Sequence, residues 1–522
     1  MSKYWSLAFS LRRFLNEPLT TQRCLEIFRQ NMQSRERNLL ALVKQAIYAN
    51  EGSPYLKLLR LTGCEYGDFE KMVRSDGIEP SLVKLCKEGV YVSIEEIKGK
   101  KQLVRGSQAF EVRESDFDNP LISGQIEANS GASRSTGTRV SYDLDFITET
   151  WAVHFRLSHE AYGVADDPVA LWYPIMPEAG PMALLAYHKA GKTPLKWFSP
   201  VEKKGFRPSL RNRMGTSYLV YMGRLLGAKW PGPDYVPLAD AWRVAQWISE
   251  GIRAKRVCRF VTYVSAAVRI CQAAKERGLD LAGTKFVVSG EPVTEVKRKE
   301  IQSLGAEIYP VYALMEAGIV GGACCAPVTA DEVHFFKDSL ALIQHPREVP
   351  HACVSVDAFL LTTLCRSTPK ILLNVETGDY GVVEKRDCGC KFGQLGLTDH
   401  IRSIRGFDKM TGEGMTFIGT DLVRILEEVL PTRFGGASTD YQVVEEEDER
   451  GHTRMSVVVS PAVGDVDERA LVQIVLAELS KGRDARRMMA HMWSQAKTLR
   501  VKRATPFTTA RGKLLPLHIQ KT

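Results

Sequence analysis

The sequence lacks the features that mark membrane-anchored, secreted and repetitive proteins. No apolar run reaches the length that spans a membrane. The first residues do not form a signal-peptide pattern, because Arg12 and Arg13 soon interrupt their short apolar stretch. Neither an internal repeat nor a low-complexity linker occurs. We therefore expect a globular, cytoplasmic protein without a membrane partner.

The chain also lacks a strong excess of positive or negative charge. The 70 Lys and Arg residues exceed the 61 Asp and Glu residues by a formal charge of +9, which is mild for 522 residues. Dense basic runs with interleaved aromatic side chains are missing, so nucleic acid is not an expected partner. Eleven cysteines are an odd number in a large chain, which argues against a disulfide scaffold.

Apolar strands alternate with amphipathic helices through the middle of the chain. Helical spacing is found at residues 20–50, 141–160, 179–190, 239–251, 266–277 and 293–304. Strands are predicted at residues 169–173, 259–263, 284–290 and 307–312, while 218–226 suits either structure. The alternation predicts an α/β fold with a parallel sheet, whose ligands bind at the carboxyl ends of the strands.

The pattern changes after about residue 325, where short β-rich segments follow one another. They are predicted at residues 332–336, 339–343, 357–364 and 371–375. Farther along, two strands (441–446 and 454–460) and a helix (466–480) predict a small α+β unit. The fold class is thus α/β: parallel sheets with a β-rich subdomain, followed by a small α+β region.

One polar loop, Asn129–Val140, has the composition of a phosphate-binding loop. Glycine lets backbone N–H groups approach an anion, hydroxyls donate to its oxygens, and Arg134 and Arg139 add positive charge. Its candidate ligand residues are Ser130, Gly131, Ser135, Thr136, Gly137 and Thr138. Such a loop is also common as an ordinary turn, so the rest of the chain must decide between the two interpretations.

Four further motifs follow in order. They are Ser289-Gly290-Glu291-Pro292, Tyr312-Ala313-Leu314-Met315-Glu316, Thr377-Gly378-Asp379 and, near the C-terminus, Ala510-Arg511-Gly512-Lys513. Each one alone is better explained as a turn, a strand end, a hairpin or a basic tail. Their joint order is much more specific than any of them singly.

In this order the motifs resemble the adenylate-forming superfamily, in particular its phenylacetate–CoA ligase-like branch. That family carries a Ser/Thr/Gly phosphate loop, then Gly-Glu-Pro, Tyr-Gly-x-Ser/Thr-Glu, Thr-Gly-Asp, an Arg-x-Asp hinge and a C-terminal Gly-Lys. The resemblance covers about residues 40 to 515, and Thr377-Gly378-Asp379 and Gly512-Lys513 are the closest matches.

The resemblance implies a role for each motif. Glu316 would help to hold Mg²⁺, Asp379 would accept hydrogen bonds from the ribose hydroxyls of ATP, and Lys513 would bridge the reacting carboxylate and the α-phosphate. The phosphate loop would hold the β- and γ-phosphates. The remaining nucleotide- or acyl-binding residues implied by the resemblance are Ser289, Gly290, Glu291 and Tyr312.

The resemblance also implies a division into domains. Residues 1–405 would form the adenylate-forming domain, 406–410 the hinge, and 411–522 a mobile lid domain that carries Lys513 and rotates between the two half-reactions. Anchored on Met410, the hinge aspartate is Asp408. Gly406 then occupies the position of the phosphate-facing arginine. Either the loop is shifted by one residue, or Arg405, our choice as catalytic residue, or Arg402 serves instead.

Other departures place the chain on a divergent part of the branch. Met315 replaces the Ser or Thr that usually touches the adenylate phosphate, and Ala313 replaces a glycine. The phosphate loop is about three residues longer than in the family, and Arg139 replaces the proline that follows it. These differences reduce the support that the resemblance gives to CoA, the standard acceptor of the family.

A set of sulfur and imidazole side chains follows Glu316. Cys325, His334, Cys388 and Cys390 could close a tetrahedral, structural zinc site, and some members of the branch carry a similar set. Cys325 is preferred over its neighbour Cys324 on the family spacing. The alternative is that the cysteines and the histidine are ordinary core residues.

The leading hypothesis is an enzyme that uses ATP and Mg²⁺ to convert a small carboxylic acid into an acyl adenylate, and then passes the acyl group to a thiol, with CoA as the first choice. Alternatives are transfer to a protein cysteine, a carrier protein or an amine, and a degenerate nucleotide-binding protein. A homodimer is a further alternative for the assembly of the chain.

Overall fold

The computed structural model describes residues 10–124, 126–129, 139–176, 179–201, 210–254, 256, 259–348, 355–406, 410–412, 415–417, 424–437, 440–449, 451–481, 484–507 and 517–519. Among these residues, no helix is long and apolar enough to cross a membrane.

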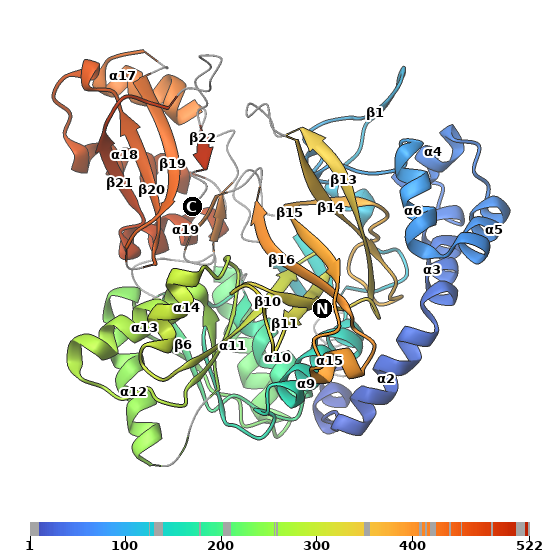
Figure 1. Ribbon diagram of the computed structural model, residues 1–522, viewed down its shortest axis with the longest axis horizontal. Coiled ribbons are helices and arrows are strands. Elements are labelled where there is room, and N and C mark those ends of the chain that lie inside the picture. The colour runs from blue at the N-terminus through green and yellow to red at the C-terminus, as the bar shows by residue number, and fades with distance from the viewer. Residues whose placement is uncertain are drawn as a thin grey trace.

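Helices form the N-terminal part, where the sequence predicts them. Residues 10–16 are helical, and the segment predicted at 20–50 is divided at Ser34 into two helices and a π-helical turn. The elements are α2 (Thr21–Gln33), α3 (Arg35–Val43), η1 (Lys44–Tyr48), α4 (Pro54–Leu61), α5 (Tyr66–Asp76), α6 (Ile78–Lys87) and α7 (Ile94–Ile97). Figure 1 shows α3 to α6 beside the outer antiparallel strands.

Two short hairpins and a helical segment lead into the main sheet. They comprise β1 (Leu103–Arg105), β2 (Gln108–Phe110), η2 (Glu114–Phe117), β3 (Ile126–Asn129), β4 (Arg139–Tyr142), α8 (Leu144–Phe146), η3 (Ile147–Ala152) and α9 (Val153–Ala161). β3 and β4 are antiparallel, with Asn129 opposite Arg139, so they flank the predicted phosphate loop on both sides.

The predicted parallel sheet is confirmed. Its strands are β5 (Val169–Trp172), β6 (Lys196–Ser199), β7 (Pro233–Tyr235), β8 (Arg259–Tyr263), β9 (Lys285–Ser289) and β10 (Glu307–Leu314), adjacent in the order β7-β6-β5-β8-β9-β10. The accompanying helices are α10 (Ala179–Lys189), α11 (Leu210–Leu225), η4 (Leu238–Asp240), α12 (Ala241–Arg253), α13 (Val264–Arg277) and α14 (Glu295–Gln302). The ambiguous segment 218–226 thus lies mainly in the helix α11.

The β-rich segment extends the same sheet with antiparallel strands, so that twelve strands of the described residues are continuous. These are β11 (Gly318–Ala323), β12 (Val333–Phe335), β13 (Leu340–Glu348), β14 (Ser355–Thr363), β15 (Val375–Lys385) and β16 (Asp399–Gly406), with the short helix α15 (Lys391–Gln394). They continue from β10 in the order β11-β12-β16-β15-β14-β13.

One predicted strand, at 371–375, is wrong. β15 begins only at Val375, because Asn374 has a positive φ of 51° that turns the chain. The backbone before it is satisfied outside a ladder: Ile371 donates to the carbonyl of Phe117, and Leu372 donates to the Thr363 hydroxyl. An apolar run here reflects burial rather than strand pairing.

A separate sheet follows, in the order β21-β20-β19-β22. Its region contains β17 (Met410–Gly412), β18 (Met415–Phe417), η5 (Ile425–Val429), α17 (Leu430–Phe434), β19 (Tyr441–Glu447), β20 (Thr453–Val459), η7 (Pro461–Val463), α18 (Glu468–Ser480), α19 (Asp484–Ala496), β21 (Leu499–Arg503) and β22 (Leu517–Ile519). The predicted α+β pattern is confirmed, with ends shifted by one or two residues. Figure 1 shows this sheet (orange to red) on the side of α13 and α14.

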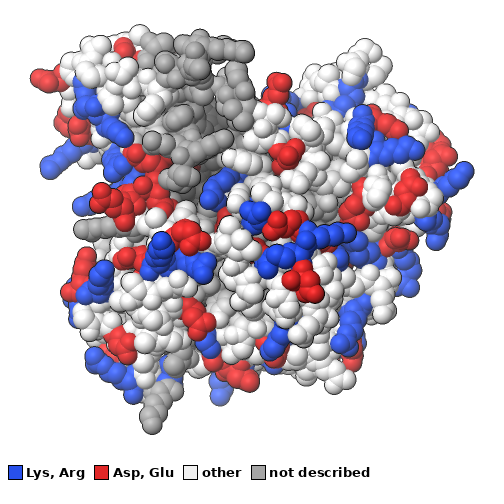
Figure 2. Space-filling view, viewed as in Figure 1, with Lys and Arg blue, Asp and Glu red and all other residues white. Residues whose placement is uncertain are grey.

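The surface in Figure 2 mixes both signs of charge. Lys and Arg side chains are interspersed with Asp and Glu over the described part of this face. Interspersed charges cancel at a distance, so the long-range field on this side is weak. Electrostatic selection of a ligand must then come from groups close to it.

Candidate active site

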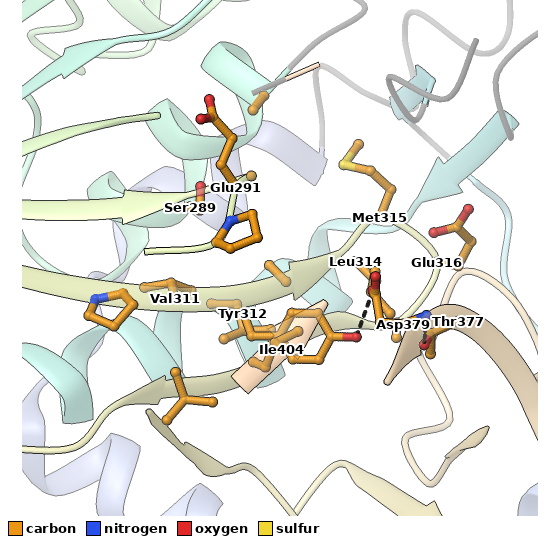
Figure 3. Close-up of a pocket in the computed structure, with 18 of the residues that line it drawn as sticks. Ser289, Glu291, Val311, Tyr312, Leu314, Met315, Glu316, Thr377, Asp379 and Ile404 are labelled. Atoms are coloured by element: carbon orange, nitrogen blue, oxygen red, sulfur yellow. Dashed lines mark hydrogen bonds between the residues drawn. The ribbon is translucent and has the colours of Figure 1, made fainter. Parts of the chain in front are cut away.

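A cavity of about 320 Å³ lies where the parallel and antiparallel parts of the sheet meet. The turn after β9, the end of β10, the start of β15 and the end of β16 all contribute to its lining. Three motifs that are far apart in the sequence therefore share one cavity: Ser289–Pro292, Tyr312–Glu316 and Thr377–Asp379. Figure 3 shows Ser289 and Glu291 at one end of the view and Glu316, Thr377 and Asp379 at the other.

Tyr312 and Asp379 form the central polar contact of the cavity. The Tyr312 hydroxyl donates to Oδ2 of Asp379 at 2.9 Å, drawn as a dashed line in Figure 3. Burial and the adjacent carboxylate raise the pKa of Tyr312 well above its ordinary value, so the phenol keeps its proton. Asp379 is 4% exposed and still lines the cavity. A carboxylate held in this way can accept hydrogen bonds from a ligand.

The turn before Asp379 depends on a glycine. Gly378 has a φ of +79°, a left-handed conformation that costs glycine little and other residues more. The Asp379 backbone N–H donates to the Thr377 hydroxyl at 3.1 Å, which closes the turn. Asp379 itself pairs with Gly406 in the ladder between β15 and β16. The Thr-Gly-Asp sequence thus fixes the carboxylate at the edge of the cavity.

Glu316 is the second residue after the end of β10 and is half-buried at the same end of the cavity. The preceding residue is anchored, because the Tyr142 hydroxyl donates to the Met315 carbonyl at 2.6 Å. In the described part of the chain, no Lys or Arg forms an ion pair with Glu316. A half-buried carboxylate without a cationic partner suits a divalent cation that arrives with a ligand.

The Gly-Glu-Pro turn is fixed by hydrogen bonds and an ion pair to neighbouring strands and helices. The Tyr173 hydroxyl lies 2.9 Å from the Ser289 hydroxyl and donates to the Thr262 carbonyl at 3.1 Å. Glu291 is fully buried as a side chain, accepts a hydrogen bond from the Ser265 hydroxyl, and lies 3.9 Å from the ammonium of Lys297. Its charge is therefore compensated within the protein.

The buried ammonium of Lys297 on α14 also binds the C-terminal region. It lies 3.5 Å from Oε2 of Glu447 and donates to the Thr453 hydroxyl at 3.2 Å. The Thr294 hydroxyl donates to both oxygens of Glu447, at 2.7 and 2.9 Å. The hairpin between β19 and β20 is thus fixed to α14, and Lys297 connects it to Glu291. We call these five residues the Lys297 cluster.

The two candidates for the phosphate-facing arginine, Arg402 and Arg405, have different surroundings in the structure. Arg405 lines the cavity at the end of β16, and its Nη1 donates to Asp331 at 2.9 Å. Arg402 forms a salt bridge to Glu384 at 3.0 Å and is not among the cavity-lining residues. Of the two, only Arg405 is placed to meet a ligand in the described cavity.

Several predicted residues lie outside the described residues. The phosphate loop (Ser130 to Thr138), the hinge residue Asp408 and the lysine Lys513 belong to this group. Their roles stay predictions from the resemblance.

The predicted metal group forms with one correction. Cys324, His334, Cys388 and Cys390 bring their donor atoms within 4.8 Å of one another, and Cys325 is not part of this group. Cys324 and Cys325 both follow the end of β11 at Ala323, and burial together with Cys390 and Cys388 raises the pKa of Cys325 to about 11. Cys324 is buried and faces it, whereas Cys325 is exposed, 3.6 Å from the Ala161 carbonyl.

The histidine in this group has the form that a metal ligand requires. Nδ1 of His334 lies 2.7 Å from the Leu397 carbonyl, which can only accept, so Nδ1 carries the proton. Nε2 is left unprotonated, 3.1 Å from Cys390 Sγ and 3.5 Å from Cys388 Sγ. Burial and the nearby His400 lower the pKa of His334 to about 4, so the imidazole is neutral near pH 7. Three thiols and a neutral imidazole fit a structural zinc ion.

The structure also reveals residues that the sequence pattern does not single out. Tyr173 and Lys297 hold the predicted side chains in place, yet each resembles an ordinary core or helix residue in the sequence. The contacts of Lys297 with Glu447 join residues 150 positions apart, which no local pattern indicates.

Comparison with known proteins extends these observations. No protein-family model and no curated protein matches the sequence. Among solved structures, the chain is similar to a 2-hydroxyisobutyryl-CoA ligase in complex with 2-HIB-AMP and CoA, with 13% identity, a TM-score of 0.54, and coverage of 94% of this chain and 90% of the ligase. A mutant of the amide bond synthetase Mcba from Marinactinospora thermotolerans aligns at 12% identity over 97% of both chains, with a TM-score of 0.43. The similarity to the ligase shows that this chain shares its fold.

Proposed function

We propose that the protein is an ATP-dependent, AMP-forming ligase that activates a small carboxylic acid. The observation that supports this most is the convergence of three separate motifs on one cavity, whose lining includes the Tyr312–Asp379 pair. A hydrogen-bonded carboxylate in the lining, together with a half-buried one that pairs with no Lys or Arg among the described residues, suits a ligand that combines a diol with polyphosphate. ATP has both.

The chemistry needs positioning and positive charge more than a protein nucleophile. A carboxylate oxygen of the acid attacks the α-phosphorus of ATP, a new C–O–P linkage forms, and the bond to the β-phosphate breaks to release pyrophosphate. A thiolate then attacks the acyl carbon, the thioester forms, and AMP leaves with the electron pair of the broken C–O bond.

In this proposal each group has one task. Asp379 accepts from the ribose hydroxyls, while Tyr312 fixes the orientation of its carboxylate. Glu316 would hold Mg²⁺, which neutralises phosphate charge when it is bound. Arg405 contributes positive charge, and Lys513 would bridge the carboxylate and the α-phosphate. The acceptor is a thiol, with CoA as the first choice.

The direct test is acid-dependent pyrophosphate release by the purified chain with ATP and Mg²⁺, measured over a panel of aromatic and aliphatic acids. We expect release that depends on the acid, with AMP formed in equal amount. Binding of ATP without any acid-dependent release would instead favour a degenerate nucleotide-binding protein. Adding CoA, a carrier protein or amines to the active mixture then identifies the acceptor by the product formed.

We also propose that Cys324, His334, Cys388 and Cys390 hold a structural zinc ion, which would tie the turn after β11 to the segment before α15. Exchange of Cys324 for serine should remove the metal and lower the midpoint of thermal unfolding. Cys325→Ser, one residue away and outside the group, is the matched control and should retain about one zinc ion per chain. Metal content and unfolding midpoints check this, and equal metal content in the two variants would contradict the assignment.

A further inference from the structure

Two helices line one part of the cavity with side chains spaced four residues apart. α10 presents Ala179, Ala183 and Tyr187, so that two small side chains leave space beneath a large one. η3 and α9 present Trp151 and Phe155. The rings of Phe155 and Tyr187 stack with centroids 4.7 Å apart and close this part of the cavity. The walls are thus mainly apolar and aromatic.

One polar atom interrupts this apolar surface at Tyr187. The side chain is fully buried, and its hydroxyl has no hydrogen-bond partner among the described residues. A buried hydroxyl without a partner costs about 1–3 kcal/mol. Two polar side chains pack against the ring, namely Arg259 and His159, whose ring centroid lies 5.2 Å from that of Tyr187, but neither of them lines the cavity. The hydroxyl is therefore best satisfied by a ligand.

The surroundings of Tyr187 favour a donating hydroxyl. The guanidinium of the buried Arg259 lies 5.5 Å from the centroid of the ring, on a side that does not line the cavity. Its positive charge makes the phenol a better donor and favours electron-rich oxygen as the partner.

A second donor without a partner lies on the same wall. Nε1 of Trp151 is buried and unpaired among the described residues, and an indole N–H can only donate. Gly318 packs closely against this nitrogen, since an added Cβ would lie 3.0 Å from it. Tyr187 and Trp151 can therefore each donate one hydrogen bond.

We infer that the acid accepted by this site carries an aromatic ring with at least one hydrogen-bond-accepting oxygen, such as a hydroxyl or methoxy group, which Tyr187 recognises. This rests on the proposed function, because it assigns the acyl end of the same cavity. The aromatic walls hold the ring, and the two donors select the oxygen. A site that contains buried donors disfavours the analogue without an acceptor, since its donors then stay unpaired.

The experiment compares matched acids: benzoate with its 3- and 4-hydroxy and methoxy forms, and phenylacetate with the same derivatives. For each acid, kcat/KM of pyrophosphate release and the Kd from a thermal-shift titration are measured in wild type and in Tyr187→Phe. We expect wild type to prefer the oxygen-bearing acid of at least one pair by about tenfold to hundredfold, and Tyr187→Phe to remove most of this preference.

Tyr162→Phe makes the same chemical change at a buried tyrosine that does not line the cavity, and it should keep the wild-type preference. Equal preference in wild type and Tyr187→Phe, or binding of no acid of either kind, would overturn the inference. Acids that bind with the expected preference but release no pyrophosphate would overturn the proposed function alone.

Discussion

Replacing Lys513 with alanine should slow acyl-adenylate formation by about 100- to 1000-fold, the loss typical of removing one charge that stabilises a transition state. The ammonium would neutralise charge on the attacking carboxylate and the α-phosphate while both approach each other. Measured as acid-dependent pyrophosphate release, this is the largest effect that we expect from a single side chain.

The same variant offers a sharper readout in the second half-reaction. Lys513 is implied to act only in adenylation, so Lys513→Ala supplied with a synthetic acyl adenylate should still transfer the acyl group to CoA. Lys502→Ala on β21 is the control, since Lys502 is an exposed lysine that lies 3.4 Å from Glu446. Wild-type pyrophosphate release by Lys513→Ala would refute the mechanism as proposed.

Asp379→Ala should weaken ATP binding by at least about 100-fold. The expected loss corresponds to two charge-assisted hydrogen bonds from the ribose hydroxyls, each worth about 1.5–3 kcal/mol. Tyr312→Phe keeps the carboxylate and removes only its 2.9 Å partner, so its effect should be clearly smaller. Isothermal titration with ATP measures both, and unchanged unfolding midpoints show that the variants are folded.

A cycle with 2′,3′-dideoxy-ATP assigns the loss to the ribose. In wild type the missing hydroxyls should weaken binding about as much as Asp379→Ala does. In Asp379→Ala the two nucleotides should bind alike, because the interaction is already absent. A full additional loss for the dideoxy nucleotide in this variant would show that Asp379 does not contact the ribose.

The strand–helix alternation of the middle of the chain was sufficient to predict the parallel sheet. A strand such as β5 (Val169–Trp172) is apolar throughout because it is buried on both faces, which is a local signal. The segment 371–375 has the same apolar character, yet it is not a strand, because burial there comes from packing around the turn at Asn374. Composition alone cannot distinguish the two situations.

In the candidate site, too, some features could be predicted from the sequence and others could not. Motif order brings Glu291, Tyr312 and Asp379 together correctly, since each motif ends or begins a strand of one sheet. The choice between Cys324 and Cys325 could not be made from the sequence, because both follow the end of β11, where no strand alternation sets the direction of a side chain. The donor role of Tyr187 could not be predicted, because an unpaired hydroxyl is a property of the packed cavity and not of the sequence.

The Lys297 cluster has a consequence for how the C-terminal region could move. The Lys297 side chain is 2% exposed and shared between Glu291, which lines the cavity, and Glu447 of the β19–β20 hairpin. Breaking a buried pair by removing one partner typically costs about 3–5 kcal/mol, because a charge is left uncompensated. Undocking the hairpin would therefore change the electrostatic potential at the Gly-Glu-Pro turn. The potential inside the cavity would then depend on the position of a hairpin that does not line it.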